Sequence, residues 1–83
     1  MSLYYFHLRD GVDILLDPEG RELDTPSGIA EAALREARAI ISEDAKKGCI
    51  DLGVRIEVED EFCNVVHSLS FADAVMIVPA RQA

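Results

Sequence analysis

The 83-residue sequence has few cysteines and no long apolar run. Two cysteines, Cys49 and Cys63, are too few for a disulfide framework, so we expect reduced thiols in a cytoplasmic protein. The longest apolar run, Ala74 to Pro79, is far shorter than the roughly 20 residues that span a bilayer. The N-terminus has no basic region followed by an apolar stretch of signal-peptide length. We therefore expect neither a membrane span nor a secretory signal.

Basic residues are also scarce. The sequence has 8 Lys and Arg against 16 Asp and Glu, which gives a net charge of −8. Binding to a phosphate backbone depends on clustered Lys and Arg, so we expect no contact with nucleic acid or with an anionic membrane. A glycine-rich phosphate loop and a Gly-x-Ser-x-Gly motif are both missing. The acidic surface instead suits a basic protein partner.

The chain does have the alternation of apolar and polar residues that is typical of strands with one buried face. It predicts strands at about residues 3–9, 12–17, 53–59 and 64–71. A stripe of Ile, Leu and Ala at helical spacing predicts a helix at about 26–47, with Thr25 as N-cap, Pro26 in the first turn and Gly48 as the stop. We expect one α+β domain, residues 1–83, in two layers. Its β-β-α-β-β chain forms a four-stranded antiparallel sheet of order 2-1-3-4, covered on one face by the single helix.

The register of the first hairpin follows from its turn. A three-residue loop that ends at Gly11 places Leu8 opposite Val12 and His7 opposite Asp13. A two-residue Asp-Gly turn would pair Leu8 with Asp13, an apolar residue with a charged one. We therefore predict a positive φ at Gly11 and a cross-strand contact between His7 and Asp13.

Two groups of side chains suggest chemistry. His7, Asp13 and Tyr5 could act as a general base, its orienting carboxylate and a hydroxyl donor. A cross-strand ion pair is the simpler interpretation, because acid–base catalysis needs a shielded site and a sheet face is open. Cys63 and His67 lie four residues apart, as in some zinc sites, but strand parity places His7 and His67 on opposite faces. We expect no enzymatic activity, no catalytic residue, no metal and no cofactor.

The single helix leaves the second face of the sheet and the apolar residues 75–78 uncovered. We expect an interaction surface comprising Tyr5, His7, Asp13, Leu15, Arg55, Val66, Val75 and Ile77. Monomers rarely expose an apolar patch of this size, so we predict a symmetric homodimer. The alternative is a monomer in which residues 75–78 fold back and add a short fifth strand.

Four short motifs occur along the chain. They are YYFHLRDG at residues 4–11, DPEGREL at 17–23, RIEVEDE at 55–61 and LSFADAV at 69–75. They resemble the motifs of a family of small bacterial proteins classed as a domain of unknown function. The resemblance implies a strand-strand-helix-strand-strand domain and no known activity. Cys63 stands where that family usually has Gly, and His67 stands where it usually has Leu.

A more distant resemblance is to HicB-type antitoxins, which share two strands, an "EG" turn and an Ala/Glu-rich helix. It implies a small basic toxin as the partner, which the acidic charge would suit. A small cytoplasmic domain that is non-enzymatic and acts through protein contacts is our leading hypothesis. A HicB-like antitoxin and, more remotely, a small metal-binding protein or hydrolase are the alternatives.

Overall fold

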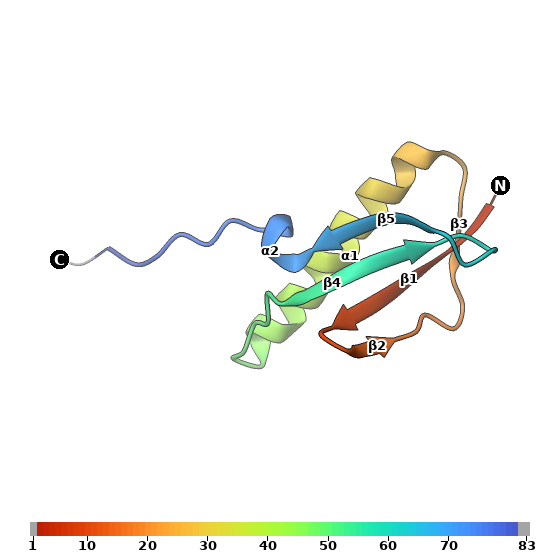
Figure 1. The fold of residues 1–83 in the computed structure, drawn as a ribbon. Helices are drawn as coiled ribbons and strands as arrows, with labels where there is room; N and C mark the ends of the chain where they lie inside the picture. Colours follow the sequence, from red (N-terminus) through yellow and green to blue (C-terminus); the bar gives the residue numbers. More distant parts are fainter. Residues whose placement is uncertain (1, 82–83) are drawn as a thin grey trace.

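A computed structural model describes residues 2–81 (Figure 1). The elements in chain order are β1 (Ser2–Asp10), β2 (Asp13–Leu15), β3 (Arg21–Leu23), α1 (Pro26–Lys46), β4 (Val54–Glu59), β5 (Val65–Ser70) and α2 (Phe71–Ala74). All strand pairs are antiparallel. The predicted α+β class is confirmed.

The sheet has five strands, one more than predicted. Its order is β2-β1-β4-β5. The fifth strand, β3, pairs with the first residues of β1, whereas β2 pairs with the last residues of β1. The order predicted for the other four strands is therefore confirmed, and the four-strand count is wrong. The sequence did not reveal β3 because its three residues, Arg21–Leu23, contain a single apolar side chain and no alternation.

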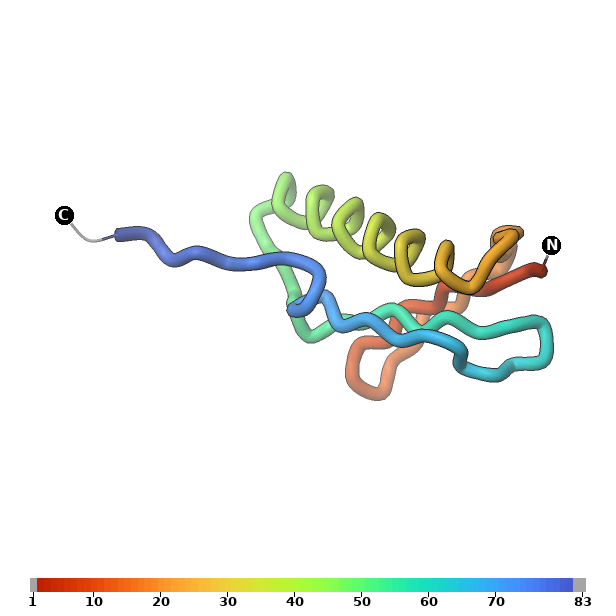
Figure 2. Tube along the Cα trace, turned by 90° about the horizontal axis from the view of Figure 1, so that it is seen from above, coloured from red at the N-terminus to blue at the C-terminus, as the bar shows by residue number. Residues whose placement is uncertain are grey.

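The core lies between α1 and the sheet, and Figure 2 shows the helix running along one side of the strands. The helix buries four side chains, Ile29, Ala33, Ala37 and Ile41. Their spacing of three or four residues forms one stripe, and its two alanines let the helix approach the sheet closely. Ile56 and Val58 on the central strand β4 are fully buried beneath it. Each such side chain stabilises the fold by roughly 1.5–3 kcal/mol.

The helix begins and ends where the sequence predicts. Thr25 is the N-cap and Pro26 occupies the first turn, but the Thr25 side chain makes no capping hydrogen bond to the backbone. Its hydroxyl lies 3.1 Å from the hydroxyl of Ser27 instead. At the other end Gly48 has φ +88°, the left-handed conformation that stops a helix. We therefore expect the Thr25 hydroxyl to contribute less than the roughly 1 kcal/mol of an ordinary cap.

The first hairpin has a different register from the predicted one. Gly11 has φ +61° as expected, but the turn holds two residues, Gly11 and Val12, and Asp10 pairs with Asp13. A glycine with positive φ at the first turn position suits a two-residue hairpin turn. All three residues of β2 are exposed, so no buried face fixes the register of this strand. The predicted three-residue loop is wrong for this reason.

The new register exchanges the two faces of β2. Leu15 is opposite Leu8, and Leu8 packs against the core. Asp13 lies on the same face as Leu15, because alternate residues of a strand share a face. His7, next to Leu8, lies on the other face. The predicted contact between His7 and Asp13 is therefore wrong.

The turn between β4 and β5 is built around Asp60. Its Oδ1 accepts the backbone N–H groups of Phe62 and Asn64, both at 2.9 Å. The carbonyl of Asp60 accepts the N–H of Cys63 at 3.1 Å. Cys63 has φ +66°, a conformation in which a Cβ atom clashes with the following carbonyl.

Replacing Cys63 with Gly is expected to raise the free energy of unfolding by roughly 0.5–1 kcal/mol. The change removes the cost of a left-handed side chain, about 1–2 kcal/mol, and adds the smaller entropic cost of Gly. Urea denaturation measures the difference. Cys63→Ala is the control, since it removes the thiol and keeps the Cβ. Equal stabilities for the two variants would contradict the prediction.

Candidate functional site

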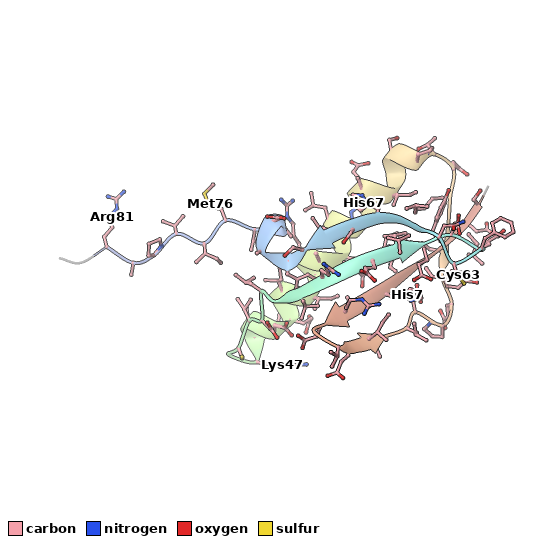
Figure 3. All side chains as sticks on the ribbon, in the orientation of Figure 1. His7, Lys47, Cys63, His67, Met76 and Arg81 are labelled. Atoms are coloured by element: carbon pink, nitrogen blue, oxygen red, sulfur yellow. The ribbon has the colours of Figure 1, made fainter. Side chains whose placement is uncertain are left out.

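The face of the sheet opposite α1, here called the outer face, carries Tyr5, His7, Arg9, Arg55, Glu57 and Glu59. One end of it is hollowed into an open groove of about 520 Å³. The groove is lined by Tyr5, His7, Leu16, Asp17, Pro18, Glu59, Asp60, Glu61 and Cys63. Strands β1 and β4 form its floor, and residues 16–18 and 60–63 form its walls. Figure 3 labels His7 on β1 and Cys63 in the β4–β5 turn.

Asp17 holds the connection between β2 and β3 against the edge of β1. Its Oδ2 accepts the backbone N–H of Phe6 at 3.1 Å. Its Oδ1 accepts the N–H groups of Glu19 and Gly20, both at 3.2 Å. Phe6 lies between the part of β1 that pairs with β3 and the part that pairs with β2. The carboxylate therefore satisfies an amide that has no strand partner on this edge.

Gly20 lets the connection approach β1 closely. It has φ +71°, and a Cβ atom there would lie 3.0 Å from the carbonyl oxygen of Tyr4 and 3.0 Å from the ring of Tyr5. A side chain at this position would press against the backbone of β1 and would also be strained at this φ. The spacing of Asp17 and Gly20 in "DPEG" thus serves one purpose, which is to fasten this loop to the strand.

His7 is buried, with 7% of its surface exposed. Its Nδ1 accepts the backbone N–H of Asp17 at 3.0 Å, so the proton of the neutral ring is assigned to Nε2. Nε2 lies 3.5 Å from Oε1 of Glu59. The ring of Tyr5 stacks beside the imidazole with a centroid distance of 6.2 Å and an angle of 10° between the planes. Both nitrogens of His7 thus face partners within the fold.

Asp17 is ionised more readily than an ordinary aspartate. Its partial burial acts to raise the pKa, but the three backbone N–H groups that it accepts and the nearby Arg21 guanidinium outweigh this effect. The pKa of Asp17 is therefore lowered. The carboxylate is in the charged form that these hydrogen bonds require.

A second set of charges lies on the outer face beyond the groove. Arg9 donates to Glu57 at 2.9 Å, and Arg55 donates to the same carboxylate at 3.2 Å. The hydrogen bond from Arg9 is the main cause of a lowered pKa for Glu57, and Arg55 adds to it. Both guanidinium groups are therefore paired within the domain. They form a boundary between the groove and the β1–β2 turn.

The predicted interaction surface is only partly brought together. Tyr5 and His7 line the groove, and Arg55 lies on the same outer face. Asp13 and Leu15 lie on the opposite face, because the hairpin register differs from the predicted one.

The remaining predicted residues lie in the last part of the chain. Val66 is exposed next to an irregularity in the β4–β5 pairing, where Val65 and not Val66 faces Glu59. Val75 follows α2 and packs against the core. Ile77 lies in the extended segment after it. These three residues do not line the groove.

Two acidic residues of the groove, Asp17 and Glu59, are absent from the predicted interaction surface. An Asp followed three positions later by Gly is a sequence signal for a side chain that binds backbone amides, and it could have indicated Asp17. The long connection between β1 and β4 gives no sequence signal for their register, which pairs Tyr5 with Glu59.

Among residues 2–81, no three His, Cys, Asp or Glu side chains are placed to share a metal ion, and no helix combines the length and hydropathy that crossing a bilayer needs. Both cysteines are free and exposed. His67 pairs with Val58, whose side chain is in the core, so His7 and His67 lie on opposite faces as predicted.

A comparison with protein families identifies the chain. The family model DUF6894, described as a domain of unknown function, matches residues 3–72. The chain belongs to this family. The predicted resemblance is thereby confirmed, whereas nothing found supports a relation of this DUF6894 chain to HicB-type antitoxins. Searches of curated proteins and of solved structures gave no significant match.

The DUF6894 match includes the whole groove and the contacts of Asp17, Gly20 and His7. It ends before the exposed apolar residues Met76, Ile77 and Val78 that follow α2, here called the apolar segment. The groove is thus part of the family domain. The apolar segment lies outside the matched region.

The lowered pKa of Asp17 predicts a dependence of stability on pH. Because the folded pKa lies below the unfolded value of about 3.9, the ionised carboxylate stabilises the fold above about pH 4 and this stabilisation is lost as the pH falls through the folded pKa. Asp17→Asn is expected to lower the free energy of unfolding at pH 7 by about 1 kcal/mol or more and to flatten its decline between about pH 5 and 2.

Denaturation by urea at a series of pH values measures this effect. Asp13→Asn is the matched control, because Asp13 is exposed on β2 and its side chain makes no described hydrogen bond. The control should retain the wild-type pH profile. Parallel profiles for Asp17→Asn and the wild type would contradict the role assigned to Asp17.

Proposed function

We propose that this DUF6894 domain is non-enzymatic and acts through protein–protein contacts in the bacterial cytoplasm. The state of His7 supports this proposal, since its Nδ1 is occupied by the Asp17 amide and its Nε2 faces Glu59. An imidazole held in this way is not free to exchange a proton with a substrate. The groove is open, whereas acid–base catalysis requires a site shielded from water. Two free thiols suit a reducing compartment.

One observation carries the proposal, and it concerns the segment after α2. Residues 76–81 run away from the domain in an extended conformation (Figure 1). Met76, Ile77 and Val78 are 86%, 61% and 75% exposed. Consecutive exposed apolar side chains of this size are typical of a segment that binds another protein surface.

We further propose that the partner of this segment is a second copy of the chain, in a symmetric homodimer. An extended apolar segment can add to the open edge of a sheet in another molecule. Strand β5 is such an edge, and it exposes Val65 and Val66. The alternative prediction, a monomer in which this segment forms the fifth strand, finds no support, since the fifth strand is β3 and residues 75–81 form no strand.

Sedimentation equilibrium at micromolar concentration tests the homodimer. The wild type is expected to have the mass of two chains, because association hides the apolar segment from water. The triple variant Met76→Ser, Ile77→Ser, Val78→Ser should have the mass of one chain. Val75 is left in place because it packs against the core.

The matched control is Val12→Ser with Leu15→Ser, which changes side chains that are equally exposed in the β1–β2 hairpin. It should remain dimeric. A wild-type mass of one chain would end the homodimer proposal. A triple variant that remains dimeric would place the interface outside the apolar segment.

A further inference from the structure

We infer that the groove on the outer face binds an arginine side chain carried by an extended segment of a basic partner protein. The inference rests on the proposed binding function, but it concerns a different surface from the apolar segment. It is carried by the charge, the aromatic rings and the shape of the groove.

Two carboxylates of the groove, those of Glu59 and Glu61, have no Lys or Arg of the groove lining beside them. The lining includes Asp17, Glu59, Asp60 and Glu61 and contains no Lys or Arg. Asp17 and Asp60 are occupied by backbone N–H groups of their own loops. Glu59 makes one contact, at 3.5 Å through Oε1 to His7, and Glu61 makes no described hydrogen bond. Glu59 and Glu61 therefore keep carboxylate oxygens for a cation from outside.

Two stacked aromatic rings lie beside these carboxylates. The rings of Tyr5 and His7 are nearly parallel, and Tyr5 is partly exposed in the groove. A guanidinium group stacks on an aromatic face while its N–H groups bind carboxylates in the same plane. Lysine has a compact, strongly hydrated charge and gains less from such a surface.

The same chemistry is already present elsewhere in this domain. The guanidinium of Arg21 lies 4.5 Å from the centre of the Phe6 ring. Its terminal nitrogen donates to Glu36 at 3.0 Å. An aromatic ring and a carboxylate thus hold an arginine within the fold, and the groove offers these two groups without the arginine.

The shape of the groove and the net charge indicate the source of the arginine. The groove is open, whereas sites for small molecules bury most of the ligand surface. Such a site suits a side chain presented by an extended chain that crosses the sheet between residues 16–18 and 60–63. The net charge of −8 would attract a basic protein and repel a nucleic acid.

The test uses a short fluorescein-labelled peptide, Ser-Arg-Thr-Arg-Ser, and fluorescence anisotropy at low salt. Two related peptides carry Lys or citrulline in place of both arginines, and citrulline is a neutral analogue of arginine. The Arg peptide is expected to bind most tightly, the Lys peptide more weakly and the citrulline peptide not at all. Equal binding of the Arg and citrulline peptides would overturn the inference.

The site is tested with the double variant Glu59→Gln, Glu61→Gln, which should weaken binding of the Arg peptide by about tenfold or more, because charge-assisted hydrogen bonds are lost. The matched control, Glu22→Gln with Glu31→Gln, makes the same change in net charge at exposed residues outside the groove. It should bind as the wild type does. Equal losses in the two double variants would show attraction by net charge alone and would overturn the site.

Two further measurements separate a loss of binding from impaired folding, and the groove from the proposed homodimer. If Glu59→Gln impairs folding through its contact with His7, Glu61→Gln alone must still weaken binding. The triple variant of the apolar segment should bind the Arg peptide unchanged, so a failure of the homodimer proposal leaves this inference intact. If the wild type is dimeric and binds none of the peptides, the inference about the groove fails and the proposed self-association stands.

Discussion

The carboxylate of Asp17 is the group on which the outer face depends. It accepts three backbone N–H groups, one from the edge of β1 and two from its own loop. The same residue's backbone N–H then binds Nδ1 of His7. Without these contacts the Phe6 amide would lack a partner on this edge, and residues 16–18 would have no hydrogen bond to hold them beside Tyr5. The groove would then lose one of its two walls.

This arrangement is the basis of the binding function that we propose. It buries the imidazole of His7 and directs both ring nitrogens to groups of the fold. The charge left over is on Glu59 and Glu61, at the rim of an open groove. An open, acidic groove with Tyr5 and His7 in its lining suits the positively charged side chain that we propose, and the apolar segment after α2 suits a second contact of a different kind.

The sequence predicted the parts of the fold that long apolar patterns specify. The stripe on α1 and the alternation in β4 both bury one face, so class, strand order and helix limits were correct. Strand β3 and the register of β2 were not, because short exposed strands carry no such pattern. Some residues of the groove belong to the predicted interaction surface and others do not. Tyr5 and His7 follow from parity, whereas Asp17 and Glu59 join them through a loop contact and a non-local register.

Hydrogen exchange of the Phe6 amide tests the role of Asp17 most directly. In the wild type this amide should be protected to the same degree as the amides of the central strand β4, although no strand pairs with Phe6 on the edge of β1 that faces Asp17. In Asp17→Ala its protection should fall much further than that of β4, because the Phe6 amide loses its acceptor whereas the β4 amides keep theirs. A Phe6 amide that exchanges as fast as an exposed loop in the wild type would contradict the account. So would a parallel loss of protection in β1 and β4.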